Sequence, residues 1–234
     1  MKRTKSSVIP PSVVRRLTEY MAFTQAFGNE NGDQWVSSQE LAQALGFTSS
    51  TVRQDLSHID FSGISKRGYH VKGLLGVLED TLGANTVWQL VVVGAGNLGL
   101  AIAQNDDFRE RGYNIIGVFD NDTAKVGRQI GALKVQHASS IKDFVTENRV
   151  DIGIVAVPAV AAQAVADVLI ASGVRGILNL SLSHIITPGN VPVIEARLTC
   201  SLLELSHRIK FSKAAKRSVS RKKPFVCRTT NKGE

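Results

Sequence analysis

The sequence predicts an α/β protein with two domains, an N-terminal winged helix-turn-helix domain and a C-terminal Rossmann domain built on a doubly wound parallel sheet. Three observations predict this class. Residues 37–59 read as a short helix, a tight turn and a second helix with a hydrogen-bonding outer face. A glycine-rich turn at 94–99 directly follows an apolar strand. From there to residue 180, strand and helix patterns alternate, which is typical of a mainly parallel sheet with helices on both faces.

The composition fits this organisation. The chain has 234 residues, 43% of them hydrophobic, which suits two modest domains. No apolar run approaches the ~20 residues that span a bilayer, and we read no secretory signal, so we expect a cytoplasmic protein with no membrane partner. Cys200 and Cys227 have no Cys or His at metal-ligand spacing, so we expect no disulfide framework and no metal. The net charge of +8 lies mostly in residues 207–234.

The first two helices are predicted from apolar spacing and capping residues. Apolar residues at mostly helical spacing predict a helix over 10–27. A second helix is expected to begin at Ser37 or Ser38 and to run to Gly46. Glu40 stands three residues after Ser37, which is the spacing of a capping box.

The third predicted helix, 49–59, is the candidate recognition helix. Val52, Leu56 and Ile59 share its apolar face, and the opposite face is polar. In a helix-turn-helix unit this helix enters the major groove, where Arg can bind guanine or phosphate and Gln can bind adenine. The same polar residues would also suit an ordinary solvated face. The candidate DNA-binding residues of this helix are Ser50, Thr51, Arg53, Gln54 and Ser57.

Residues 61–71 predict the wing. Two short extended pieces around Gly63–Gly68 would form a hairpin with Lys66 and Arg67 at or near its tip. Cations placed beside a recognition helix can hold phosphates or enter a narrow minor groove. A further helix then leads to a domain boundary near residue 83.

The turn Gly94-Ala95-Gly96-Asn97-Leu98-Gly99 predicts a dinucleotide site, because this GxGxxG fingerprint stands between a strand and a helix. The first glycine turns the backbone off the strand, the second lets a pyrophosphate approach, and the third lets the helix pack on the sheet. Asp120 ends the next strand, where a carboxylate accepts hydrogen bonds from the adenine ribose of NAD(H) and repels the 2′-phosphate of NADP(H). A merely structural glycine turn is the alternative.

The remaining alternation predicts the rest of the sheet. Helices are expected over 98–111, 139–148 and from Pro158 to about 172, and strands over 114–119, 133–135, 151–157, 176–180 and, at the edge, 190–194. The turn at Val157-Pro158 follows a buried strand. Ligands of such sheets bind at the carboxyl ends of the strands, so both residues join the candidate dinucleotide site.

An amphipathic helix is predicted over 198–211, after the doubly wound domain is complete. Its apolar stripe needs a surface to cover it, either in its own domain or in a second subunit. Residues 213–234 are rich in cations and poor in apolar side chains, so we expect a disordered tail that is either simply solvated or in weak contact with phosphates.

Taken together, these segments resemble the Rex family of bacterial redox-sensing transcriptional repressors over about Val8 to Phe211. They occur in the family's order and spacing: IPPSVVRRL, VSSQELAQALG, STVRQDLS, KRGY, LVVVGAGNLGLAI, FRERGYNIIGVFDNDTAKVG, DIGIVAVPAVAAQ and GVRGILN. The resemblance implies a homodimer joined by a swapped C-terminal helix. It also implies repression of fermentation or respiration genes through operator DNA, relieved by NADH.

The resemblance assigns roles to individual residues. Positions that contact DNA in the family match Arg53, Lys66, Arg67 and Gly68. Positions of the dinucleotide site match Gly94, Gly96, Leu98, Gly99, Asp120 and Pro158. Arg16 matches a first-helix arginine that helps to couple the two domains.

The chain departs from the family pattern at several positions. Gln54 replaces the usual Lys, and Leu100 and Asn105 stand where the family usually has Arg and Tyr. Before the final helix, Arg197 stands where the family has an aspartate that can pair with the first-helix arginine. That tyrosine and aspartate belong to the family's NADH switch. A divergent paralogue that has kept the dimer and the dinucleotide site but lost NADH-regulated DNA binding is therefore an alternative.

A small NAD-dependent oxidoreductase is the other alternative. It would need a general acid or base and a substrate pocket, but the sequence has no Tyr-x-x-x-Lys pair and His184 is the one candidate acid. We therefore expect no enzymatic activity. The predicted parts are 1–82 for DNA binding, 83–197 for NAD(H) binding, 198–212 for dimerisation and 213–234 as the basic tail.

Overall fold

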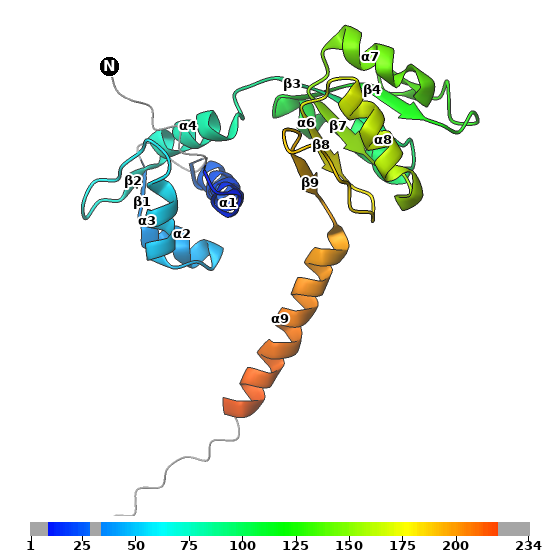
Figure 1. Ribbon diagram of the computed structural model, residues 1–234. Helices are drawn as coiled ribbons and strands as arrows, with labels where there is room; N and C mark the ends of the chain where they lie inside the picture. The colour runs from blue at the N-terminus through cyan, green and yellow to red at the C-terminus, as the bar shows by residue number, and fades with distance from the viewer. Residues whose placement is uncertain (1–8, 29–33, 220–234) are drawn as a thin grey trace, which may run out of the picture. The chain divides into compact units, whose positions relative to one another are not determined.

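The computed structural model describes residues 9–28 and 34–219, with side chains up to Phe211. The chain forms two compact units, and each is described by itself (Figure 1). The first unit extends to Trp88 and includes Asp106–Asn114; the second holds Gln89–Asn105 and the chain from Ile115 onward. Within the described ranges, no helix is both long enough and apolar enough to cross a membrane.

Up to residue 83, the described chain forms four helices and a small sheet. They are α1 (Pro11–Gly28), β1 (Trp35–Val36), α2 (Ser38–Leu45), α3 (Ser49–Leu56), β2 (Tyr69–His70) and α4 (Val71–Leu82). Their apolar faces meet in one core. Val52, Leu56 and Ile59 are all buried in this core, as predicted for the inner face. The helix predicted over 49–59 was too long, because α3 ends at Leu56 with Ser57 as its cap and Ile59 lies in the turn that follows.

Local capping builds the helix-turn-helix unit. The Ser37 hydroxyl accepts a hydrogen bond from the Glu40 N–H at 3.1 Å, and the Glu40 carboxylate accepts one from the Ser37 N–H at 2.8 Å, which confirms the capping box. Gly46 ends α2 with a φ of 73°, which glycine adopts without strain. Thr48 caps α3, so residues 46–48 alone join the two helices.

The wing differs in detail from the predicted hairpin. An antiparallel bridge joins Ile64 to Gly68 and closes a tight loop that carries Lys66 and Arg67, as expected. The strand after this loop, β2, pairs with β1. Sequence reasoning missed β1 because two residues are too few to reveal an alternating pattern.

The second unit is built on a seven-stranded sheet. The strands are β3 (Trp88–Val93), β4 (Tyr113–Asp120), β5 (Gln129–Ile130), β6 (Leu133–His137), β7 (Ile152–Val155), β8 (Gly176–Asn179) and β9 (Val193–Glu195). Their order in the sheet is β5-β6-β4-β3-β7-β8-β9. Without the antiparallel edge strand β5, this is the strand order of a Rossmann fold, which confirms the predicted doubly wound sheet.

Helices cover both faces of the sheet. On one face, α7 (Ile141–Asn148) and α8 (Ala159–Ala171) share a core with Val91, Val93 and Val155. On the other face, α5 (Asn97–Ala103) packs close to Val92 at Gly99. Successive residues of β3 therefore contact helices on opposite faces, as expected for a strand buried on both sides.

Some predicted boundaries were wrong. The single helix expected over 98–111 is two helices, α5 and α6 (Asp106–Glu110), because α5 ends at Gln104 and a new helix begins with two acidic residues in its first turn. The helix expected from 139 begins as a short 3-10 turn, η1 (Ala138–Ser140), before α7. Strand β5 was not predicted.

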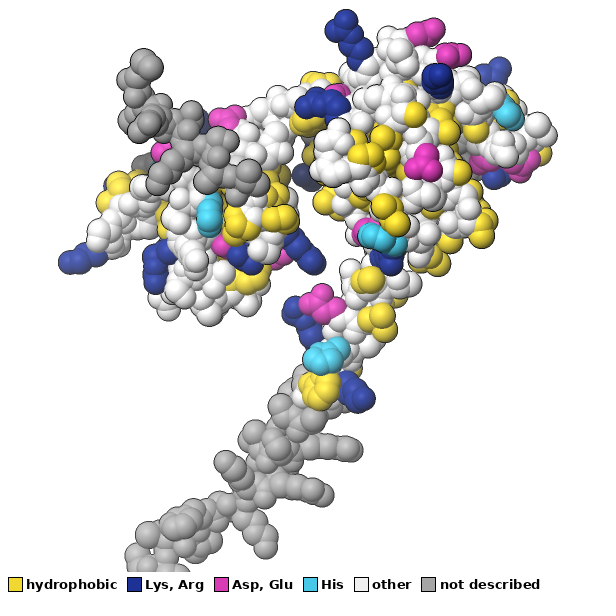
Figure 2. Space-filling model, viewed as in Figure 1, with side chains coloured by type: hydrophobic (Ala, Val, Ile, Leu, Met, Phe, Trp, Pro, Cys, Tyr) yellow, Lys and Arg dark blue, Asp and Glu magenta, His cyan; other side chains and the backbone are white. Residues whose placement is uncertain are grey.

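The last element is α9 (Leu198–Val219), which begins where the sequence predicts it. It continues beyond the expected limit of 212, and residues 220–234 of the predicted tail lie outside the described part of the chain. Its apolar side chains are exposed, and several are visible along the helix in yellow in Figure 2. They include Leu198, Leu202, Leu205 and Ile209, which recur at helical spacing.

Candidate dinucleotide site and nucleic-acid interface

The glycine-rich turn leaves β3 where the strand order reverses between β3 and β7, the usual ligand position in this fold. Gly94 has a φ of 108°, and a Cβ there would collide with the Ala156 carbonyl oxygen. A Cβ at Gly99 would collide with the carbonyl oxygen of Gly94. At Gly96 a Cβ would meet no atom within 4 Å, so the space beside this glycine is open to a ligand.

Asp120 stands at the end of β4 and is 9% exposed. One carboxylate oxygen accepts hydrogen bonds from the Ala95 N–H at 2.7 Å and from Lys125 Nζ at 3.1 Å, and the other accepts one from the Asp122 N–H at 2.8 Å. Since each carboxylate oxygen offers about two lone-pair sites, the second oxygen has room for one more donor. Asp120 can therefore support the glycine turn and still bind a hydroxyl group.

The ionisation of Asp120 follows from the same contacts. Burial would raise the pKa of its carboxyl group. The Asp122 N–H and the Lys125 ammonium, together with the Ala95 N–H, favour the charged form and hold the pKa below its ordinary value. Asp120 is therefore a carboxylate at neutral pH.

A cavity of about 1000 Å³ extends from this turn, a size within the range of small-molecule and cofactor sites. The predicted residues that line it are Gly94, Gly96, Asn97, Leu98, Asp120, Val157 and Pro158. Ala95 and Gly99 are buried behind the lining and support it. The structure thus brings the predicted dinucleotide residues together around one cavity.

Sequence reasoning missed part of the lining. Lys125 and Asp122 lie beside Asp120, and Leu180, Ser181 and Leu182 come from the loop after β8. The loop residues carry no recognisable motif. Lys125 follows the end of β4 by five residues, and the fold of this loop brings its ammonium to Asp120.

The recognition helix presents the predicted polar residues, but several of them already have local contacts. Ser50, Arg53, Gln54 and Ser57 are exposed, and Thr51 is half-buried. The hydroxyls of Ser50 and Thr51 both contact the capping residue Thr48, and that of Ser57 donates to the Gln54 carbonyl oxygen. Arg53, which also donates to the Ser38 hydroxyl at 3.2 Å, and Gln54 are the long side chains on the exposed surface of this helix.

The wing lies next to this helix. Together they border a cavity of about 500 Å³, whose lining includes Arg53, Lys66, Arg67, the capping residue Ser37 and Ser38 of α2. In the space-filling view, Lys and Arg side chains project from this part of the N-terminal unit (Figure 2). A cationic groove with helix N-termini on its border suits a phosphate backbone.

Arg67 does not extend freely from the wing tip. Its guanidinium lies 4.0 Å from the centre of the Trp35 ring, a cation–π contact that joins the wing loop to β1. Gly68, with a φ of 93°, packs so closely on Val36 that a Cβ would clash with its carbonyl oxygen. The loop is therefore held against β1, and Gly68 has a structural reason to be glycine.

Arg16 contacts the recognition helix. Its guanidinium donates two hydrogen bonds to Asp55 of α3, at 2.6 and 2.7 Å, and the Tyr20 hydroxyl donates a third at 2.7 Å. Burial would raise the pKa of Asp55, but the bonds from Arg16 and Tyr20 outweigh it and lower the pKa below the ordinary value. This ion pair fastens α3 to α1, and sequence reasoning did not foresee it because the two residues are 39 positions apart.

The departures from the family pattern also have defined positions. Arg197 forms an ion pair with Glu195 at 3.1 Å. Leu100 lies on α5 and Asn105 in the link between α5 and α6. In the part of the chain that the structure describes, no group of three or more His, Cys, Asp and Glu residues could hold a metal ion.

Two family models match the chain. One, described as the N-terminus of a putative DNA-binding protein, covers residues 8–57. The other, described as a CoA binding domain, covers residues 85–183. Their spans coincide with the helix-turn-helix region and with most of the Rossmann sheet.

Curated relatives match nearly the whole chain. The redox-sensing transcriptional repressor Rex of Thermosipho africanus is 42% identical over 201 residues, which are 86% of this chain and 96% of that protein. Rex of Carboxydothermus hydrogenoformans is 42% identical over 206 residues, 88% of this chain and 99% of that protein.

Solved structures agree. The crystal structure of RSP, a Rex-family repressor, superposes with a TM-score of 0.82 at 31% identity and covers 91% of this chain and 99% of that one. RSP in complex with β-NAD⁺ and operator DNA gives a TM-score of 0.81 at 30% identity, covering 93% and 100%. RSP is also known in complex with β-NADH, with a TM-score of 0.82 and coverage of 91% and 99%.

A helix-turn-helix unit with a basic wing, followed by a Rossmann domain with a dinucleotide-sized cavity, defines the class of two-domain transcriptional regulators. Identity above 40% over almost the full length of curated relatives specifies the family. The chain belongs to the Rex family of redox-sensing transcriptional repressors.

Proposed function

We propose that this protein is a DNA-binding transcriptional repressor that senses the NADH/NAD⁺ ratio and releases operator DNA when NADH binds. The observation that carries the proposal is the cavity at the glycine turn, with the Asp120 carboxylate in its lining, in the same chain as a helix-turn-helix unit with an exposed Arg53. Its relatives are named as redox-sensing repressors. The solved relative binds both NADH and NAD⁺.

The proposed roles follow the geometry. The pyrophosphate lies against Gly96, and the ribose hydroxyls donate to the free site on Asp120. The negative charge of Asp120 disfavours a 2′-phosphate, so the cofactor is NAD(H) rather than NADP(H). On the DNA side, Arg53 and Gln54 contact base edges or phosphates, together with Ser50, Thr51 and Ser57 at the helix surface. Lys66, Arg67 and Gly68 form the wing contact.

The switch requires two conformations with different affinities for both ligands. If NADH binds the DNA-free conformation more tightly, it shifts the population away from the operator complex. By linkage, operator DNA lowers the affinity for NADH by the same factor. The proposed parts are residues 1–82 for DNA, 83–197 for the dinucleotide and 198–212 for subunit contact. Arg16 remains a proposed coupling residue, in addition to its bond with Asp55.

The test uses a duplex that this protein selects from a random-sequence DNA library. Its dissociation constant is measured at one fixed salt concentration without ligand, with NAD⁺ and with NADH. We expect tight, salt-dependent binding that NADH weakens by at least about fivefold. Binding that is equally tight with and without NADH would contradict the proposal and favour a divergent paralogue.

We also propose a homodimer in which α9 packs on a second subunit. Every apolar residue of its stripe, from Leu198 to Ile209, is at least 49% exposed within one chain. A helix with such a stripe gains stability only by burying it. A second copy of the same chain is the usual partner, because most soluble oligomers are symmetric homo-oligomers.

The dinucleotide is proposed as a signal rather than a reagent. The titratable residues that line the described cavity, Asp120, Asp122 and Lys125, gather at its ribose end. A dehydrogenase would need an acid or base beside the nicotinamide. We place the repressor in the cytoplasm, where it meets its DNA. Turnover of NAD⁺ with a panel of alcohols and hydroxy acids would contradict the purely regulatory role.

A further inference from the structure

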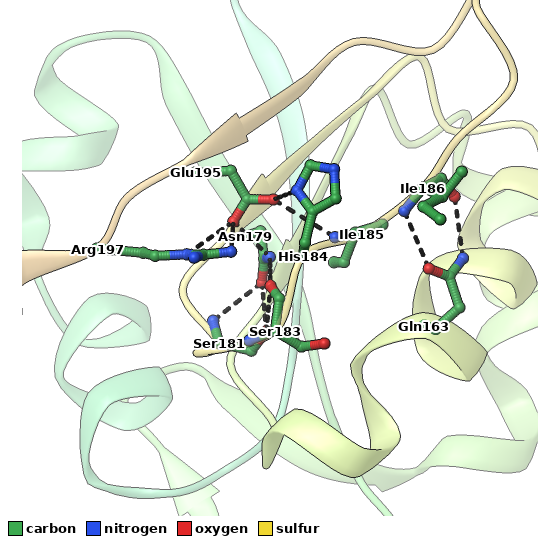
Figure 3. A network of polar contacts seen from close by, with 9 residues as sticks. All are labelled: Gln163, Asn179, Ser181, Ser183, His184, Ile185, Ile186, Glu195 and Arg197. Carbon is green, nitrogen blue, oxygen red and sulfur yellow. Dashed lines mark hydrogen bonds and ion pairs between the residues drawn. The ribbon is translucent and has the colours of Figure 1, made fainter. Parts of the chain in front are cut away.

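Glu195, the last residue of β9, is a shared acceptor for three parts of the Rossmann domain (Figure 3). Its Oε2 accepts hydrogen bonds from Asn179 Nδ2 at 2.8 Å and from the Arg197 guanidinium at 3.1 Å. Its Oε1 accepts one from the Ile185 N–H at 3.4 Å and lies 3.2 Å from His184 Nδ1. One carboxylate thus joins the end of β8, the loop after β8 and the residue before α9.

The loop after β8 belongs to the dinucleotide cavity, since Leu180, Ser181 and Leu182 line it. The fully buried Asn179 holds this loop: its Oδ1 accepts hydrogen bonds from the Ser181 N–H at 2.9 Å and from the Ser181 hydroxyl at 2.7 Å. The same side chain donates to Glu195. An occupant that moves the lining loop therefore disturbs hydrogen bonds that end on Glu195.

The middle of the loop after β8 is anchored to α8. Gln163 Nε2 donates to the Ile186 carbonyl oxygen at 2.9 Å, and Gln163 Oε1 accepts from the Ile186 N–H at 3.0 Å (Figure 3). Because Ile186 is fixed to α8, a displacement of the cavity-lining residues 180–182 must be taken up by residues 179–185. This stretch includes Asn179 and Ile185, which both donate hydrogen bonds to Glu195.

The first turn of α9 is tied to the same group. Arg197 directly precedes α9, and its side chain, 28% exposed, donates to Glu195 through both Nε and a terminal nitrogen. The backbone leaves little freedom at this point, because the Ala196 N–H donates to the Asn179 carbonyl oxygen and the Cys200 N–H to that of Arg197. The Glu195–Arg197 pair therefore orients the beginning of the helix.

We propose that Glu195 is a positioning residue that couples occupancy of the dinucleotide cavity to the orientation of α9. The inference rests on the proposed function, because it takes NADH as the occupant and α9 as the helix that joins subunits. Arg197 thus passes the signal from the cavity to α9 through its ion pair with Glu195, a residue of the same Rossmann domain. Because such coupling is reciprocal, fixing α9 in one orientation also changes the affinity for NADH.

Hydrogen exchange of the full-length protein, with and without saturating NADH, tests the proposal. The variants are Glu195→Gln, which replaces the shared carboxylate, and Arg197→Gln, which removes the ion pair between that carboxylate and the residue before α9. The matched control is Glu204→Gln, which removes a carboxylate from an exposed pair with Arg208 on α9. In the parent and the control, NADH should slow exchange at residues 94–99 and change the exchange rate at residues 198–205 by roughly fivefold.

Both link variants should keep the NADH effect at 94–99 and lose the effect at 198–205. If α9 in these variants still responds as in the control, the proposal is overturned. If NADH protects nothing in the parent, the proposed function fails and this inference fails with it. If α9 responds in the parent and not in the variants, but DNA affinity ignores NADH, the coupling role stands while the proposed repressor switch fails.

Discussion

At the scale of single residues, Asp120 is where binding of the dinucleotide is most directly tested. We expect Asp120→Ala to weaken NADH binding by about 10- to 100-fold, because a charge-assisted hydrogen bond contributes about 1.5–3 kcal/mol and the alanine also removes the acceptor for the Ala95 N–H. Titration with NADH, followed by calorimetry, measures the loss. Asp143→Ala, on the exposed surface of α7, serves as the control. Equal affinity in the two variants would mean that the ribose lies elsewhere.

We expect the free energy of unfolding to depend on pH through the carboxyl group of Asp55. Its pKa is lowered in the folded chain, so the carboxylate stabilises the fold above the ordinary aspartate pKa of about 4 and this contribution is lost as the pH falls through the lower folded value. We expect Asp55→Asn to reduce the free energy of unfolding by about 2 kcal/mol near neutral pH. Urea unfolding should show the difference from the parent shrinking below pH ~4. A difference that is constant down to pH ~3 would contradict this assignment.

We expect substitution of Trp35 to have a small effect on the affinity for DNA. A cation–π contact contributes about 0.5–1 kcal/mol at an exposed site, so Trp35→Leu should weaken DNA binding by roughly two- to fivefold, whereas Trp35→Phe should retain most of the affinity. The reason is that the aromatic ring holds Arg67 beside the recognition helix. In an Arg67→Ala background, Trp35→Leu should have no further effect. An equal loss in both backgrounds would show that the ring acts in some other way.

At the scale of elements, two glycines of the GxGxxG turn should differ in their roles: Gly96 in NADH binding and Gly99 in the stability of the fold. Gly96→Ala introduces a Cβ into empty space, so the domain should fold as the parent does but bind NADH at least about tenfold more weakly, because the methyl group occupies the approach of the pyrophosphate. Gly99→Ala places its Cβ against the Gly94 carbonyl oxygen and should lower the thermal unfolding temperature. Parallel melting curves and NADH titrations compare the two variants. Unchanged NADH affinity in Gly96→Ala would contradict the proposed pose.

Elements with strong local signals were predictable, and weak ones were not. The capping box at Ser37, the GxGxxG turn and the buried β7 strand are each encoded by neighbouring residues, so their sites could be placed from the sequence. The two-residue strands β1 and β5 offer no periodicity, and their formation depends on pairing with β2 and β6. For the same reason the pairing partner of the wing strand was not foreseen.

At the scale of the whole molecule, the prediction concerns assembly. Leu202→Ser combined with Leu205→Ser should raise the dimer dissociation constant by at least about tenfold, because burying a leucine contributes roughly 1.5–3 kcal/mol. Sedimentation equilibrium measures this constant. Glu204→Ser with Arg208→Ser, on the same helix but outside the apolar stripe, should leave it nearly unchanged. If both double variants assemble like the parent, the subunits meet through another surface.

By itself the sequence determined the order of the two domains, the recognition helix and the dinucleotide turn, because each depends on the spacing of residues close together in the chain. Only the tertiary structure decided the partners of charged side chains: Arg16 with Asp55, Lys125 with Asp120, and Arg197 with Glu195. It also brought the loop after β8 into the cavity. The physical reason is that a charge is satisfied by whichever opposite group the folded backbone brings within reach. Arg16 and Asp55 are 39 positions apart, and the two nearer pairs depend on how the loop after β4 and the end of β9 fold.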